Sequence, residues 1–166
     1  MSSNINFSRK KMMTINAEDR CEVKDIKAEN VINFPDGIVG FEQLKNFVIL
    51  LNDKVAPFMF MQSLDDTQIN FVCIETFLVK PDYSFKIPDN TVARLGIEQT
   101  NDVLLLSIAT IKPDAKESTA NLLSPIVVNM KNMQAEQVIL DSSNYPVKYR
   151  IWDNIEKKEP HEAVTA

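Results

Sequence analysis

The sequence is poor in the residues that many enzymes use for chemistry. Its 166 residues include three glycines, two cysteines and one histidine. Gly37, Gly40 and Gly96 do not form the closely spaced set that a glycine-rich phosphate loop needs. The histidine, His161, lies in a polar tail, whereas a catalytic triad needs an imidazole oriented inside the fold. These shortages exclude phosphate-loop enzymes and disfavour triad hydrolases.

The two cysteines also limit the possibilities. A structural zinc site needs clustered Cys and His ligands, which Cys21, Cys73 and a histidine in the tail do not supply. A disulfide between Cys21 and Cys73 stays open, but the N-terminus lacks the apolar core of a secretion signal, which favours two reduced thiols. No apolar run reaches the roughly 18 residues of a membrane helix. We therefore expect a cytoplasmic protein without metal, cofactor or membrane contact.

The charge balance is mildly acidic, with a formal net charge of −5 and a pI of about 4.9. Nucleic-acid binding relies on clustered Lys and Arg, so direct binding to nucleic acid is disfavoured. An acidic surface favours association with a basic protein partner, because opposite fields steer encounter. An acidic surface that only keeps the protein soluble is an equally simple interpretation of this net charge.

The organisation predicts one folded unit with loose ends. About 45% of the residues are hydrophobic, enough for a core in a chain of this length. Residues 1–10 are polar and are expected to form a flexible leader, and residues 154–166 a flexible charged tail. The expected domain is 11–153.

Short apolar runs separated by polar or proline-containing turns recur inside this unit, a pattern typical of β-strands. The expected strands are 12–16, 21–24, 30–34, 47–51, 58–63, 69–75, 83–87, 103–111, 126–130, 136–140 and 148–151. Residues 88–95 predict a short helix that Gly96 terminates, and 41–46 predict one turn. The fold class is therefore all-β: a compact antiparallel β-barrel-like single domain with one or two short helices.

Two of the expected strands differ in pattern. Tyr83, Phe85 and Ile87 alternate with polar residues, which predicts a strand with one wet face. Residues 102–111 are apolar on both faces, so other parts of the protein must pack on both sides of this strand. This happens at the centre of a β-sandwich or where a strand of a barrel coils.

Two functional alternatives can be weighed from the residues. The adjacent carboxylates of Asp65 and Asp66 could belong to a hydrolytic pair, but a second carboxylate about 5–10 Å away across a cleft would be required, and adjacent acids usually mark a solvated turn. A nucleic-acid-binding barrel would alternate aromatics with Lys and Arg on an exposed face. Only Lys86 beside Tyr83 and Phe85 resembles that pattern.

Four segments occur in a specific order: 33–42 (NFPDGIVGFE), 56–66 (APFMFMQSLDD), 118–129 (STANLLSPIVVN) and 136–140 (EQVIL). Together they resemble the motifs of the flagellar assembly factor FliW family, over roughly residues 13–151. The resemblance implies a protein-binding regulator with two partners, flagellin and the translational repressor CsrA. Bound flagellin would prevent the protein from binding CsrA, so CsrA would be free to repress flagellin translation. Export of flagellin would release the protein, which would then bind CsrA and relieve the repression. The alternative is a flagellin-binding chaperone that does not regulate CsrA. In both cases the protein is expected to be monomeric when it is free of partners.

We expect the residues that carry the resemblance to be mainly structural: Phe34, Gly37, Gly40, Phe41, Glu42, Pro57, Phe58, Gln62, Ser63, Asn121, Leu122, Pro125 and Asn129. Acidic side chains at strand ends are the candidates for contact with basic CsrA, namely Asp65, Asp66, Glu75 and Asp102. An amphipathic helix of flagellin would dock on an apolar groove. Phe58, Phe60 and Met61 could line such a groove, although burial in the core is the favoured interpretation.

Overall fold

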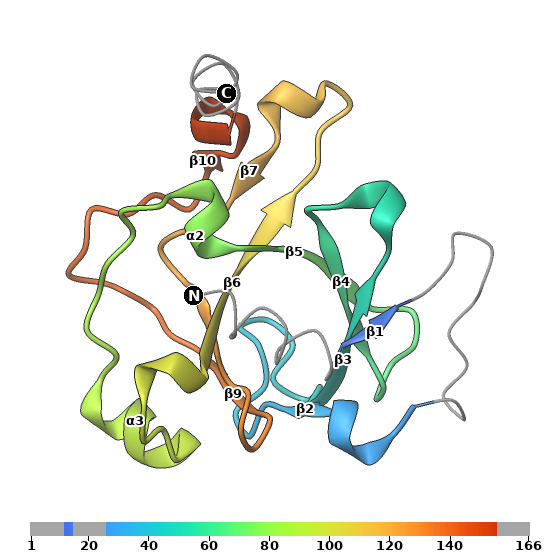
Figure 1. The fold of residues 1–166 in the computed structure, drawn as a ribbon, viewed down its shortest axis with the longest axis vertical. Coiled ribbons are helices and arrows are strands. Elements are labelled where there is room, and N and C mark those ends of the chain that lie inside the picture. Colours follow the sequence, from blue (N-terminus) through green and yellow to red (C-terminus); the bar gives the residue numbers. More distant parts are fainter. Residues whose placement is uncertain (1–11, 15–25, 156–166) are drawn as a thin grey trace, which may run out of the picture.

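The computed structural model describes residues 12–14 and 26–155 (Figure 1). Its strands are β1 (Met13–Thr14), β2 (Ile32–Asn33), β3 (Asn46–Leu51), β4 (Met59–Ser63), β5 (Asn70–Glu75), β6 (Val103–Thr110), β7 (Thr119–Ala120), β8 (Ile126–Asn129), β9 (Gln134–Gln137) and β10 (Tyr149–Arg150). The α-helices are α2 (Thr76–Val79) and α3 (Asp89–Leu95). The 3₁₀ turns are η2 (Ala28–Asn30), η3 (Asp53–Val55), η4 (Thr100–Asp102) and η5 (Ala115–Glu117).

The sheet closes on itself as a barrel. Strands follow one another in the order β6, β5, β4, β3, β2, β9 and β8, and β8 pairs with β6 again. The β-barrel fold is thus confirmed, but it is mixed rather than antiparallel throughout. β2 runs parallel to β9, and β1 runs parallel to β3. Parallel neighbours require a long connection, which the many residues between β2 and β9 provide.

The barrel interior holds the main hydrophobic core. Phe34 and Phe47 are fully buried there, with ring centroids 5.2 Å apart in an edge-to-face arrangement. Met61 on β4 and Leu106 on β6 are also fully buried there. Such burial of large apolar side chains is the main stabilising contribution to the fold.

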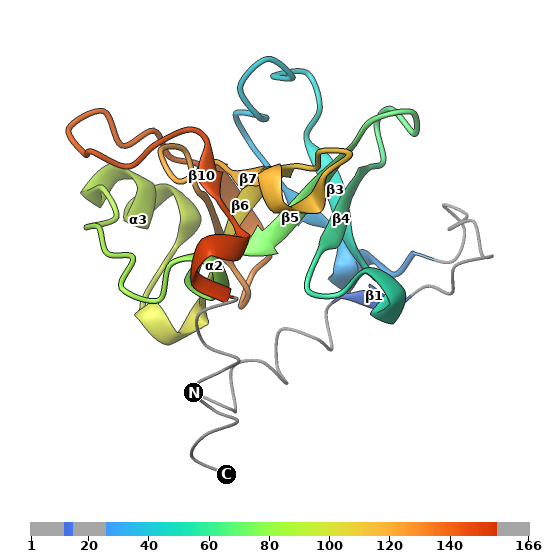
Figure 2. The same cartoon turned by 90° about the horizontal axis from the view of Figure 1, so that it is seen from above.

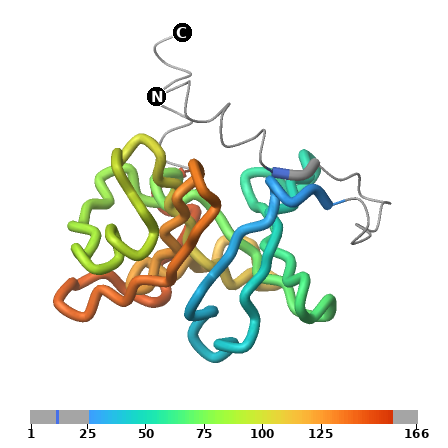
Figure 3. Tube along the Cα trace, turned by 90° about the horizontal axis from the view of Figure 1, so that it is seen from below, coloured from blue at the N-terminus to red at the C-terminus, as the bar shows by residue number. Residues whose placement is uncertain are grey.

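β6 is covered on both faces, as its sequence predicted. Leu104 and Leu106 point into the barrel core. Val103 and Leu105 lie on the outer side and pack in a second cluster with residues of the 83–97 region. Figures 2 and 3 show that region, with α3, on one flank of the barrel beside the chain that leads through β8 and β9.

A three-stranded ribbon extends from the end of β6 that leads into β7. β7 pairs with β6 and with β10, and one face of this ribbon packs in a third cluster with Phe58 and Trp152. A helical turn follows at 152–155, where the Asn154 amide donates to the carbonyl of Val79 and to the hydroxyl of Tyr149. The turn therefore packs on the domain just beyond the expected boundary at 153.

Several expected elements differ in the structure. Residues 83–87 belong to no strand ladder. The backbone of Ser84 is hydrogen-bonded by the Tyr145 hydroxyl, which accepts the Ser84 amide at 3.0 Å and donates to the Ser84 carbonyl at 2.8 Å. Residues 41–46 contain the expected turn, at residues 42–43, whereas α2 and β7 were not expected. The strand expected at 136–140 begins earlier, at Gln134, after Met133 with a φ of 60°. The strand expected at 21–24, the leader 1–10 and residues 156–166 of the tail lie outside the described residues.

Candidate functional site

Residues 76–100, here called the cover segment, run across the outer wall of the barrel. The segment comprises α2, the extended residues 83–87 and α3 (Figure 1). α3 forms because Asp89 suits the positive N-terminal end and Gly96 adopts the left-handed conformation (φ 63°) that ends the helix. The cover segment packs against outward-facing residues of β6 and β8.

Side-chain hydrogen bonds fix both ends of the part of the cover segment that runs from Tyr83 to Gly96. At one end the buried Tyr83 hydroxyl donates to the carbonyl of Leu122 at 2.7 Å, and its ring lies 4.4 Å from that of Tyr145. Burial raises the pKa of Tyr83 well above its usual value, so this hydroxyl stays protonated and can donate. At the other end the Asn129 amide donates to the carbonyls of Leu95 and Gly96 at 2.9 and 3.2 Å. These bonds satisfy carbonyls at the C-terminus of α3.

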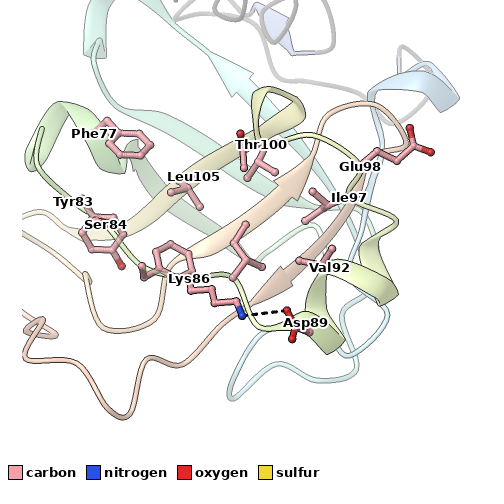
Figure 4. A pocket seen from close by; sticks show the side chains of 13 residues that line it. Phe77, Tyr83, Ser84, Lys86, Asp89, Val92, Ile97, Glu98, Thr100 and Leu105 are labelled. Carbon is pink, nitrogen blue, oxygen red and sulfur yellow. Dashed lines mark ion pairs between the residues drawn. The ribbon is translucent and has the colours of Figure 1, made fainter.

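An apolar groove of about 520 Å³ lies between the cover segment and the wall (Figure 4). Its lining is mainly aliphatic and aromatic: Phe77, Tyr83, Phe85, Ile87, Val92, Ile97, Val103 and Leu105. Polar side chains at its edge are Ser84, Lys86, Asp89, Glu98 and Thr100. Lys86 and Asp89 form an ion pair of 3.5 Å between highly exposed side chains, which contributes little to stability.

Exposed apolar side chains gather beside this groove on α2. Phe77 is 51% exposed and lines the groove, whereas its neighbour Leu78 is 45% exposed and lines a smaller hollow beside Pro57 and Phe58. Exposed apolar side chains that adjoin an apolar groove are typical of surfaces that bind a partner. This end of the groove therefore has the character of a binding surface.

The four acids expected to contact a partner do not form one patch. Asp65 and Asp66 follow β4 and precede β5, whereas Glu75 is the last residue of β5, so the two sites lie at opposite ends of that strand. Asp102 lies in η4, before β6, toward the end of β5 that carries Glu75.

Asp65 is bound to the protein's own backbone. Its carboxylate accepts the amides of Lys45 and Asn46 at 2.6 and 2.8 Å and the Asn46 side-chain amide at 3.2 Å. Partial burial raises its pKa, but these hydrogen bonds outweigh that effect and leave the pKa below its ordinary value. Asp66 accepts the amide of Gln68. The adjacent pair therefore shapes the turn between β4 and β5.

The motif residues make many local contacts of the same kind. The side chain of Asn121 accepts the amides of Leu123 and Ser124, and that of Gln62 donates to the carbonyls of Ser63, Thr67 and Ile69. Ser63 accepts the amide of Asp66, and Glu42 accepts that of Gly40. Phe34, Leu122, Pro125 and Asn129 are buried, Phe41 packs edge-to-face on Phe71 at 5.2 Å, and Pro57 follows a cis peptide bond.

The apolar residues proposed from the sequence for a groove, Phe58, Phe60 and Met61, lie elsewhere. Met61 is fully buried, and Phe58 packs edge-to-face on Trp152, with centroids 6.0 Å apart. Phe60 lies on β4 and is half-buried. None of the three lines the apolar groove. The sequence signal nearest to the groove is the alternation of Tyr83, Phe85 and Ile87, which marks the apolar side chains that line it but not the hollow itself.

Within the described ranges, no three His, Cys, Asp or Glu side chains are grouped so that they could hold a metal ion. In the same ranges, none of the helices has the length and apolar character needed to cross a bilayer. The fold and the groove define a small mixed β-barrel protein with an apolar groove on its outer wall.

Comparison with known proteins identifies the family. The FliW protein family model matches residues 15–151, and the chain belongs to this family. A flagellar assembly factor FliW of Bacillus pumilus is 42% identical over 137 residues, covering 82% of this chain and 94% of that protein. One from Caldicellulosiruptor bescii is 39% identical over 135 residues, covering 81% and 88%. A crystal structure of the flagellar assembly factor FliW matches with a TM-score of 0.72 and 37% identity, covering 76% of this chain and 88% of that one.

Proposed function

We propose that this protein is a cytoplasmic flagellar assembly factor that binds flagellin and CsrA in turn and performs no catalysis. Membership of the FliW family supports the flagellar role. The proposed binding role is inferred from the apolar groove beside the half-exposed side chain of Phe77. The groove offers apolar contact area and no histidine, cysteine or metal cluster among its lining residues, which suits binding rather than chemistry.

The apolar groove is the proposed site for flagellin. An amphipathic helix binds such a groove by inserting apolar side chains spaced three or four residues apart. A volume of about 520 Å³ accommodates a few large side chains rather than a whole helix. The helix would therefore lie across the opening, with Phe77 packing against its flank.

CsrA is the proposed basic partner. The net charge of −5 favours its approach, and Asp66, Glu75 and Asp102 remain the proposed contacts. Asp65 is a weaker candidate, because its carboxylate already accepts three hydrogen bonds within the turn. Charge reversal of Asp66 is the cleaner test and should slow association and flatten its salt dependence. An unchanged association rate and salt slope would remove this residue from the proposed contact.

The regulatory mechanism follows from mass action. If flagellin and CsrA exclude each other on this protein, each lowers the apparent affinity of the other. Abundant cytoplasmic flagellin then leaves CsrA free to repress flagellin translation. Export of flagellin releases this protein, which binds CsrA and relieves the repression.

Titration calorimetry with flagellin and CsrA from the same organism, separately and in competition, tests this proposal. Binding of both with mutual displacement is the expected result. Binding of flagellin alone would favour the alternative, a flagellin chaperone without the regulatory arm. Binding of neither would overturn the proposal.

A further inference from the structure

The ribbon of β6, β7 and β10 has a polar outer face with a defined register. Thr110 lies opposite Thr119, and Thr119 lies opposite Arg150. Directly opposite residues of antiparallel strands project to the same side, so these three side chains form one row. With the residues two positions away on the same face, they line an open hollow of about 420 Å³: Thr110, Lys112, Glu117, Thr119, Lys148 and Arg150. We call these six residues the basic face.

The opposite side of the ribbon holds this face in place. Ala109, Ala120 and Ile151 alternate with the basic-face residues and are buried against Ile74 and Val79. Because successive side chains of a strand point to opposite sides, burial of one set keeps the other set directed outward. The basic face is therefore a fixed surface of the fold.

The basic face is positively charged, whereas the protein as a whole is negatively charged. Three cationic side chains stand beside one carboxylate, Glu117, in a chain whose net charge is −5. Within the described ranges, Lys112 and Lys148 form no ion pair. Arg150 reaches Asp153 only at 3.7 Å, and both side chains are more than half exposed. Arg150 also donates to the carbonyl of Lys116 at 3.3 Å, and its remaining N–H donors, with the ammonium groups of Lys112 and Lys148, are available to an external anion.

We propose that the basic face binds an acidic segment of a partner protein. The Arg150 guanidinium can pair with one carboxylate through two hydrogen bonds, the threonine hydroxyls can donate to it, and Lys112 and Lys148 can meet neighbouring carboxylates. A nucleic acid fits less well, because no aromatic side chain lines the hollow for base stacking. The face shares no lining residue with the apolar groove, so this site goes beyond the flagellin and CsrA sites proposed above.

A labelled peptide of alternating Glu and Ser tests the proposal by fluorescence anisotropy at low salt. The variant K112E/K148E should bind it at least about tenfold more weakly than the wild type. The matched variant K27E/K54E changes the net charge equally at two exposed lysines outside the face and should stay within about twofold. Circular dichroism should show both variants folded. Equal loss in both variants, or no binding to the wild type, would overturn the proposal.

Two further measurements show where the peptide binds and whether the protein prefers an acidic peptide or a nucleic acid. Amide shifts in NMR spectra of the wild type should change on peptide addition at Thr110, Lys112 and Thr119, and changes elsewhere alone would overturn the site. A short oligothymidine should bind more weakly than the peptide. Tighter binding of the oligonucleotide would overturn the proposal in favour of a nucleic-acid ligand.

Discussion

Arg94 on α3 and Glu136 on β9 form a two-point ion pair that joins the cover segment to the barrel wall. The Nε atom of Arg94 donates to one carboxylate oxygen at 3.1 Å, and its Nη2 donates to the other. The hydroxyl of Thr91 adds a third hydrogen bond to this carboxylate at 3.2 Å. The Glu136 side chain is only 16% exposed, so the pair is better shielded from water than the other ion pairs near the groove.

Removing the charge of Glu136 should loosen α3 and with it the apolar groove. In E136Q the amide keeps one acceptor oxygen but faces Arg94 with a second donor group, so the two-point pair is lost. We expect the melting temperature to fall by about 2–4 °C. Amide hydrogen exchange in 89–95 should accelerate more than exchange in β3. Uniform acceleration in both elements would show that the pair does not act locally.

Phe77 should contribute to flagellin binding more than to stability. Its side chain is half-exposed and packs edge-to-face on Tyr83, with ring centroids 6.5 Å apart, so F77S should lower the free energy of unfolding by only about 1 kcal/mol. Affinity for flagellin should fall about tenfold, because an apolar contact at the edge is lost. The control is I111S, since Ile111 is 48% exposed but does not line the groove. Equal affinity of the two variants would contradict the proposed site.

Much of the barrel could be predicted from periodicity. Residues of β6 are apolar on both faces because one face fills the barrel and the other supports the cover segment, so the sequence indicates two-sided cover. The same reasoning located α3, where Asp89 and Gly96 mark its ends. Strand partners are set by tertiary contacts rather than by local pattern, and the parallel pairing of β2 with β9 was therefore missed.

The groove was harder to predict than the fold. Alternation of Tyr83, Phe85 and Ile87 reports which side chains are buried, but not whether the backbone joins a ladder. The segment 83–87 packs on the wall without a backbone ladder, and the hollow beneath it depends on distances that no local pattern encodes. Acidic residues at strand ends were reasonable candidates for contact with CsrA. The sequence does not show, however, which acidic residues lie at the same end of the barrel.

Asp65 should make stability depend on pH in the acid range. Its pKa is lower in the folded protein than its ordinary value of 3.8, so the ionised form stabilises the fold above that pH. This contribution disappears as the pH falls from 3.8 through the folded pKa. D65N should therefore be less stable than the wild type at pH 7, and the difference should shrink at pH 3. Urea unfolding measures it, with D66N as the control. A constant difference at both pH values would contradict the linkage.

Cys73 should be unreactive in the folded protein. It is fully buried on β5, and burial raises the pKa of its thiol to about 12. Fewer than about one thiol in a thousand would be ionised at pH 8, and the thiolate is the reactive species. In a C21S background, iodoacetamide should label the protein only after urea is added. Labelling at similar rates with and without urea would show that β5 opens readily.

Gly37 and Gly40 should respond very differently to alanine, although both have positive φ angles. A Cβ atom at Gly37 would lie 2.6 Å from the Cα and carbonyl oxygen of Glu42, whereas one at Gly40 meets no atom within 4 Å. G40A should cost only the left-handed strain of about 1–2 kcal/mol. G37A adds a clash with backbone that cannot rotate away, so we expect a loss of about 3 kcal/mol or more. Urea unfolding of both variants compares them directly. Similar losses would mean that the loop 35–42 relaxes around the new methyl group, and that the φ angle alone determines the glycine requirement.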